Sequence, residues 1–348
     1  MTRIRTLVAA LVIALPIPAA VAGCGSSGSG GNNEDPTQVL KETFNNPTKI
    51  TSGNLSISLS GSAEGSQSGN LSATIDGPFQ ADTTNSNTFP QLDLTAKVSA
   101  SGAGQSFSFD GSLIATKDNA YVEYQGQTYE VGTALFKKFA QAYERSASQA
   151  HAQNNQQQSA SSIFKQFGVD PSTWLTNVSN EGTTDVDGQD TIHIHGDADV
   201  SRIVSDLNKI AQQAGSATQS VSPAQLDQLK SAVKSASIDV YAGTSDKLLR
   251  KLSLALTIEP PASSGVTSVN VNFSVTLSDV NQPQTVSAPS GAKPLTGLLQ
   301  QFGINGSALG ALGAASGAGA GGSSAYANCL KGATSAADIQ KCAQRAGG

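Results

Sequence analysis

The stretch VNVNFSVTLS, residues 269–278, alternates one apolar residue with one polar residue along its whole length. Because successive side chains of a β-strand point to opposite faces of the sheet, this alternation predicts a strand with one buried face and one solvated face. Strands of parallel sheets are buried on both faces and are therefore apolar throughout. The stretch thus predicts a strand of an antiparallel sheet.

The same alternation recurs elsewhere in the chain, in residues 55–59, 92–98, 107–109 and 252–258. Residue pairs that favour tight turns lie where hairpins need them, at Asp76-Gly77, Gln125-Gly126 and Asp187-Gly188. We expect about ten strands between residues 49 and 280.

Helical segments interrupt these strands. The first begins at Asp35, which suits a helix cap, and Pro36, which suits the first helical position. Further helices are expected where apolar residues recur at helical spacing, in residues 133–143, 163–167, 171–175, 199–210 and 222–233. Asp170 and Asp199 suit the caps of the helices that begin there. Strands, then helices, then strands again predict an α+β domain with helices on one face of an antiparallel sheet.

The N-terminus has the pattern of a bacterial export signal. Arg3 and Arg5 precede an apolar segment, residues 7–17, that is too short for a comfortable membrane span. Residues 21–24 read VAGC, and small residues directly before a cysteine resemble the lipobox of bacterial lipoproteins. In such proteins the cysteine thiol receives a diacylglyceryl group and becomes the new N-terminus after cleavage. A plain secretory signal is the alternative.

We therefore expect a signal peptide over residues 1–23, acylation of Cys24 by chains such as palmitate, and a flexible Gly/Ser-rich tether over residues 24–34. Two acyl chains hold a protein on a membrane where one barely does. The expected location is the extracytoplasmic face of the cell membrane, with the N-terminal lipid as the anchor.

Charge and composition exclude several kinds of partner. The formal net charge is −5 and only 14% of the residues are charged, without clusters of Lys and Arg. Binding to nucleic acid needs concentrated positive charge, so no nucleic-acid partner is expected. The sequence indicates no particular protein partner, and we expect a monomer.

Sequence motifs of enzymes are missing. The chain contains no G-x-S-x-G elbow, H-E-x-x-H pair, phosphate-binding loop or dinucleotide fingerprint, so we expect neither catalysis nor a cofactor. His193 and His195 have the spacing of two zinc ligands on one strand face. Because no cysteine or third histidine lies nearby in the sequence, we expect an exposed strand face there and no metal site.

Three local features resemble the LppX/LprG-type lipoproteins of actinobacteria and, more distantly, LolA and LolB. They are the strand and turn at 71–81 with the sequence Asp76-Gly77-Pro78-Phe79, the hairpin at 181–195, and the closing strand at 269–280 with Pro283 and Pro289 after it. The resemblance covers residues 49–290 and is one of order and pattern. This chain departs from it in a Gln-rich insert, a Gly/Ala-rich linker and a C-terminal cysteine pair.

The resemblance implies a half-barrel, a curved antiparallel sheet with helices covering its concave face, in a domain that we place at residues 35–290. It also implies that the domain holds or moves acylated lipids in an apolar cavity between sheet and helices. The alternative is a surface interaction or sensory lipoprotein with a close-packed core and no ligand. The candidate lining residues are Leu55, Ile57, Leu94, Phe107, Phe136, Phe139, Phe164, Trp174, Leu254, Leu256, Val271 and Phe273.

The C-terminal region differs in composition from this domain. Residues 291–324 are expected to be a Gly/Ala-rich linker, and residues 325–348 a small helical hairpin. With Cys24 acylated, Cys329 and Cys342 remain as an even pair in an oxidising compartment, which favours a disulfide. Free thiols for redox chemistry or metal binding are the alternative.

Thiol labelling tests the expected disulfide between Cys329 and Cys342. A bridge that closes a loop of this size stabilises the folded unit by about 3 kcal/mol in the chain-entropy model. We expect unreduced protein to show no reactive thiol and reduced protein to show two more, measured by mass spectrometry after alkylation. Two reactive cysteines in unreduced protein would reject the bridge.

Overall fold

The computed structural model describes residues 34–85, 87–153, 169–213, 228 and 230–301. Several expected features lie outside the described residues. They are the signal peptide, the acylated Cys24 and nearly all of its tether, the helix at 163–167 with Phe164, the start of the helix at 222–233, the linker beyond residue 301, and the hairpin with Cys329 and Cys342.

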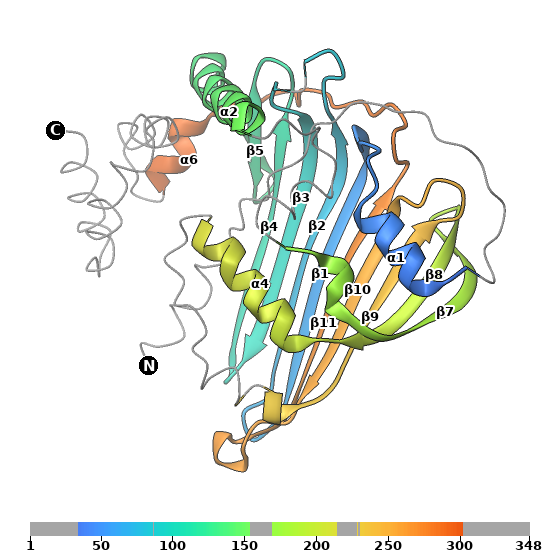
Figure 1. The fold of residues 1–348 in the computed structure, drawn as a ribbon. Coiled ribbons are helices and arrows are strands. Elements are labelled where there is room, and N and C mark those ends of the chain that lie inside the picture. Colours follow the sequence, from blue (N-terminus) through green and yellow to red (C-terminus); the bar gives the residue numbers. More distant parts are fainter. Residues whose placement is uncertain (1–33, 86, 154–168, 214–227, 229, 302–348) are drawn as a thin grey trace.

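One open sheet of 12 strands dominates the molecule (Figure 1), in the spatial order β12-β6-β5-β4-β3-β2-β1-β11-β10-β9-β8-β7. Neighbouring strands are antiparallel from β6 to β7, as the alternation predicts, and the two-residue strand β12 runs parallel to β6. In chain order the strands are β1 (Ser52–Gly65), β2 (Gly69–Gln80), β3 (Gln91–Gly102), β4 (Gln105–Ala115), β5 (Ala120–Tyr124), β6 (Gln127–Glu130), β7 (Leu175–Val186), β8 (Gln189–Ala198), β9 (Val233–Gly243), β10 (Leu249–Ile258), β11 (Val266–Ser278) and β12 (Lys293–Pro294).

The helices begin where the sequence places caps. The side chain of Asp35 accepts a hydrogen bond from the backbone of Gln38 at 2.8 Å, and Asp199 accepts one from Arg202 at 3.0 Å. None of the described helices is long and apolar enough to cross a membrane. The helices are α1 (Pro36–Phe44), α2 (Thr133–Gln153), α4 (Val200–Gln213) and α6 (Leu295–Gln301), with short 3-10 turns η1 (Pro171–Trp174) and η2 (Ala262–Ser264).

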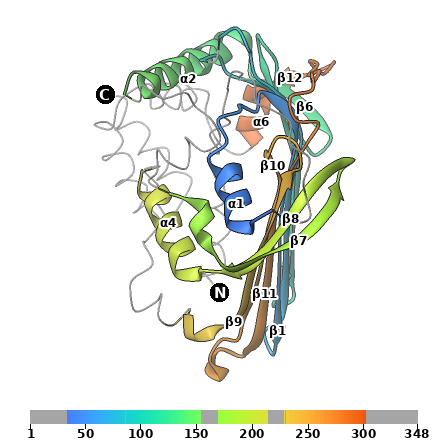
Figure 2. The ribbon, with the colours of Figure 1, turned by 45° about the vertical axis from the view of Figure 1, so that its right-hand side comes forward.

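Helices α1, α2 and α4 lie on one side of the sheet in both views (Figures 1 and 2), which gives the expected α+β architecture. Two clusters of buried side chains join helices to strands. In the first core, Val39 and Leu40 of α1 pack with Ile192, Ile194 and Val240 of β8 and β9. Full burial of each such side chain contributes about 1.5–3 kcal/mol.

The second core lies near the start of α2, where Phe136 packs with Phe79, Leu92 and Ala115 of β2, β3 and β4. Phe89 adds edge-on ring contacts to Phe136 and Tyr143, with centroid distances of 6.2 and 5.2 Å. The two cores fix the helices to different parts of the sheet.

Regular secondary structure continues beyond residue 290, where the linker was expected to begin. Lys293 and Pro294 pair in parallel with Tyr129 and Glu130 of β6, and Leu298 of α6 is 7% exposed. Without β12, the backbone of β6 would be unpaired on its outer side. A strand of two residues is too short to show alternation, so the sequence does not predict β12.

The turn expected at Asp76-Gly77 is wrong, because both residues lie inside β2 and pair with β1. Gly77 instead tests the close approach of β2 and β3. It adopts φ 148°, which side chains rarely allow, and an added Cβ would collide with the carbonyl oxygen of Asp93. We expect Gly77→Ala to lower the free energy of unfolding by about 3 kcal/mol, measured by urea denaturation. The control is Gly126→Ala, where φ is 72° and nothing lies within 4 Å of the added Cβ. That change should cost only about 1 kcal/mol, and equal losses would contradict the close contact.

Candidate functional site

The register of the strands gathers the apolar positions on one face of the sheet. Leu254 lies opposite Phe273, Phe273 opposite Leu59, and Leu59 opposite Ala73. Leu254 also packs against the first core, which contains α1. We call the side of β1–β5 and β9–β11 that carries these residues the apolar face; it is the side on which the helices lie.

The expected lining residues of the strands share this face. Cross-strand pairing connects them in rows through Gly61, Leu71 and Ala100 among others. The eight residues are Leu55, Ile57, Leu94, Phe107, Leu254, Leu256, Val271 and Phe273.

The expected lining residues of the helices occupy different places. Phe136 is buried in the second core, and Phe139 is half-buried in α2. Trp174 packs against the first core, and its Nε1 donates a hydrogen bond to Oδ2 of Asp206 in α4 at 2.9 Å. Phe164 lies outside the described residues. Trp174 therefore links α4 to the sheet.

The apolar face is covered unevenly. The large hydrophobic side chains that stay exposed in the described part of the chain are Leu71, Phe107, Phe109 and Leu113, at 38–43%. All four lie on this face, because Phe107 and Leu71 both oppose Ala100, Phe109 opposes Val98, and Leu113 opposes Leu94. Helix α1 instead packs on β7 and β9, at the other end of the sheet. The wing formed by β2–β4 thus presents contiguous apolar surface.

An aromatic pair borders this exposed wing. The rings of Phe109 and Tyr124 stack at 5.8 Å, inclined by 29°. The Phe109 ring lies over Gly111, where an added Cβ would come within 2.9 Å of it. A side chain at residue 111 would therefore push the ring off this position.

Charged side chains of these strands lie on the opposite face. Strands β1–β4 carry five of them, and each sits at a polar position of the alternation. They are Glu64, Asp76, Asp93, Lys97 and Asp110. A molecule on the apolar face of β1–β4 therefore meets only apolar side chains, glycine and one terminal glutamine, Gln105, which suits hydrocarbon and not a charged substrate.

The two histidines on the opposite face share a carboxylate that the sequence did not reveal. His193 Nε2 and His195 Nδ1 each lie 2.8 Å from Oδ1 of Asp239 in β9. The Tyr241 ring stacks on His193 at 4.5 Å, and Lys251 Nζ lies 5.4 Å from the Tyr241 centroid. Within the described residues no group of three or more His, Cys, Asp and Glu side chains is arranged to hold a metal ion. We interpret the cluster as a hydrogen-bonded network.

The pKa of Asp239 lies below its usual value. Burial raises it, but the hydrogen bonds from His195 and His193, together with their charges when protonated, outweigh burial. The carboxylate is thus held ionised between the two rings.

Comparison with known proteins finds matches among solved structures but none by sequence. No protein-family model matches the chain, and no curated protein matches its sequence. LprF from Mycobacterium bovis is similar in structure at 12% identity and a TM-score of 0.35, over 75% of this chain and 100% of that chain. The Mycobacterium tuberculosis lipoprotein LppX is similar at 13% identity and a TM-score of 0.32, over 72% and 98%. A DUF1329 family protein from Desulfovibrio piger reaches 10% identity and a TM-score of 0.18, over 72% and 93%.

LppX is one of the two lipoproteins that give their names to the family that the sequence resembles. At these TM-scores the functional argument rests on the geometry of this chain.

Asp239→Asn tests the histidine network through pH. A carboxyl with a lowered pKa stabilises the fold above its unfolded pKa, near 3.9, and loses that contribution as pH falls through the folded value. We expect the variant to lose about 1–2 kcal/mol of unfolding free energy at pH 7 and to approach the wild type as pH falls through the lowered pKa of Asp239. The control is Asp118→Asn at an exposed turn, which should change little. A deficit that persists unchanged in acid would contradict the assignment.

Proposed function

We propose that this chain is a membrane-anchored lipoprotein of the cell envelope that binds acylated lipid against the apolar face of its sheet and passes it on. The proposal includes no catalytic step and no cofactor. The protein acts as a monomer, held on the extracytoplasmic face of the cell membrane by the acylated Cys24.

The observation that carries the proposal is the exposed apolar wing of β2–β4. A folded protein normally buries large side chains such as Leu71, Phe107, Phe109 and Leu113, and contiguous exposed apolar surface marks a binding site. The wing lies on the helix side of the sheet and adjoins the second core, which contains Phe136 and against which Leu94 packs. Hydrocarbon placed here would continue that core.

The chemistry of the face favours acyl chains over other apolar ligands. Each methylene group removed from water contributes about 0.8 kcal/mol, so a long chain binds without a charged anchor. The rows of Leu, Ile, Val and Phe run across many strands, which gives an extended lining for an extended ligand. A lipid anchor at Cys24 would keep this lining next to the membrane that supplies the ligand.

A double variant of the exposed wing tests lipid binding. Leu71→Gln with Leu113→Gln places two amides on the proposed path of the acyl chain at positions that are 39% and 43% exposed. Since about two methylene contacts are lost, we expect affinity for a fluorescent acyl probe to fall about tenfold. Lipid that copurifies without detergent, measured by native mass spectrometry, should fall with it.

Matched substitutions on the opposite face of the same strands provide the control. Thr74→Gln and Ser112→Gln should leave lipid binding unchanged. Thermal denaturation should show a loss below about 1 kcal/mol for the Leu variant, as for other surface changes. The proposal is wrong if the wild-type protein never carries lipid and the variants lose only stability. The protein would then be a surface interaction lipoprotein with a close-packed core and no ligand.

Cys24→Ser tests the anchor. Serine has no sulfur to form the thioether, so we expect the variant to stay unprocessed or to become soluble, while the wild type carries acyl mass on its N-terminus. Membrane fractionation and intact-mass measurement read this out. Lipidation would be excluded if the variant still partitioned fully with membranes and the wild type carried no acyl mass.

A further inference from the structure

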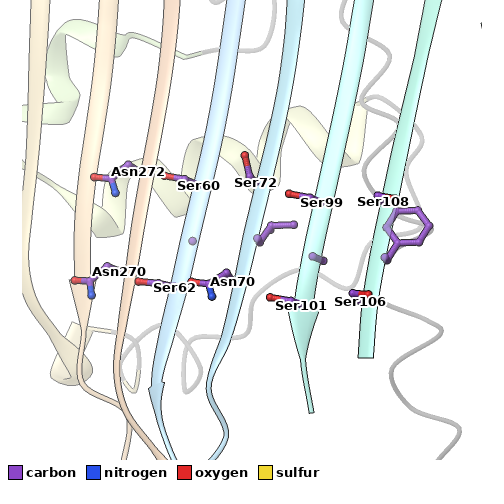
Figure 3. A pocket seen from close by; sticks show the side chains of 14 residues that line it. Ser60, Ser62, Asn70, Ser72, Ser99, Ser101, Ser106, Ser108, Asn270 and Asn272 are labelled. Atoms are coloured by element: carbon purple, nitrogen blue, oxygen red, sulfur yellow. The ribbon is translucent and has the colours of Figure 1, made fainter. Parts of the chain in front are cut away.

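The face of the sheet opposite the helices is hollowed. Figure 3 shows two rows of small polar side chains that cross five neighbouring strands and line a hollow of about 460 Å³. One row is Asn272, Ser60, Ser72, Ser99 and Ser108, and the other is Asn270, Ser62, Asn70, Ser101 and Ser106. Gly61, Leu71, Ala100 and Phe107 lie between the rows. We call this site the polar groove.

The hydrogen bonding of the polar groove differs from that of its surroundings. On the same face outside the groove, neighbouring side chains pair across strands: Ser58 with Ser274 at 2.9 Å, and Thr95 with Ser112 at 3.0 Å. Within the described structure only one groove side chain, Asn270, has such a bond, from Thr257 at 3.0 Å. The donors and acceptors of the other nine groove side chains are therefore available to water or to a ligand.

The groove contains no charge. Its ten polar side chains are hydroxyls and carboxamides, which both donate and accept hydrogen bonds. The nearest charged groups along these strands are Lys97 and Asp110, which pair with each other at 3.7 Å, and Glu64. The five groove strands carry one cationic side chain, Lys97, and it is paired with Asp110, so they offer a polyanion no cluster of positive charge.

From this geometry we propose that the polar groove binds a neutral polysaccharide chain that runs across the strands. Five strands spaced by about 4.8 Å span about 19 Å, enough for several sugar units in line. Sugar hydroxyls both donate and accept, as the two rows do, so each unit can replace the water that solvates a pair of groove side chains. The polar groove and the apolar face lie on opposite sides of the sheet, so polysaccharide binding can be tested independently of lipid binding.

An extended peptide fits the groove less well. Peptides that bind to sheets usually add a strand at an edge through backbone hydrogen bonds. The five groove strands, β11, β1, β2, β3 and β4, are all interior to the sheet and have neighbours on both sides. A ligand can therefore contact only their side chains.

Titration of the purified full-length chain with soluble neutral hexasaccharides tests the proposal. The probes are maltohexaose, cellohexaose and mannohexaose. Their binding is measured by isothermal titration calorimetry at low and at high salt. We expect at least one probe to bind, with an affinity that does not change with salt because no ion pair forms. Ser72→Val with Ser99→Val removes two facing hydroxyls and introduces residues that favour strands, and should weaken binding at least tenfold.

The control variant removes a facing pair on the same face outside the groove, Thr95→Val with Ser112→Val, and should bind within twofold of the wild type. The proposal is overturned if no probe binds at about 10 mM. It is equally overturned if both double variants weaken binding alike, or if only charged polymers or peptides bind. Thermal denaturation of the same samples shows whether the groove variants remain folded.

Discussion

The register of β11 against β1 and β10 keeps the two faces of this sheet chemically distinct. Because strand side chains alternate, a slip of one residue would place Val271, Phe273 and Val275 in water and Asn270 and Asn272 under the helices. Each large apolar side chain moved into water costs about 1.5–3 kcal/mol, and whole domains are stable by only about 5–15 kcal/mol. The pairing of β1 with β11, which are far apart in sequence, thus determines which residues face the helices and which form the polar groove.

Much of the fold follows from local patterns in the sequence. Alternation predicts strands β1, β3, β4, β10 and β11, and turn residues predict the β5–β6 and β7–β8 hairpins. Asp35, Asp170 and Asp199 predict helix starts because their carboxylates accept backbone hydrogen bonds. The eight strand residues expected to line a cavity do share one face, since face is set by parity along a strand. Strand β12 could not be predicted, because two residues show no periodicity.

Sequence alone does not predict features that depend on which residues lie opposite each other. Asp239 bonds to His193 and His195, which lie 46 and 44 residues before it in the sequence, so no local spacing motif predicts this contact. The polar groove is missed for the same reason: Ser and Asn look like ordinary solvated strand positions until register aligns ten of them in two rows. The four exposed hydrophobic residues of the β2–β4 wing read as core positions in the sequence, and only the placement of α1 at the other end shows that they are not covered by it.

The sheet ends in two unjoined strands, β12 on one side and β7 on the other. A closed barrel has a circumference fixed by its strand number and stagger, and its interior therefore has one size. An unclosed sheet has no such restriction, since its ends can move apart or together while every ladder stays intact. The curvature of the apolar face is consequently not fixed by closure, so the proposed lipid-binding surface can adapt to acyl chains of different length without breaking a backbone hydrogen bond.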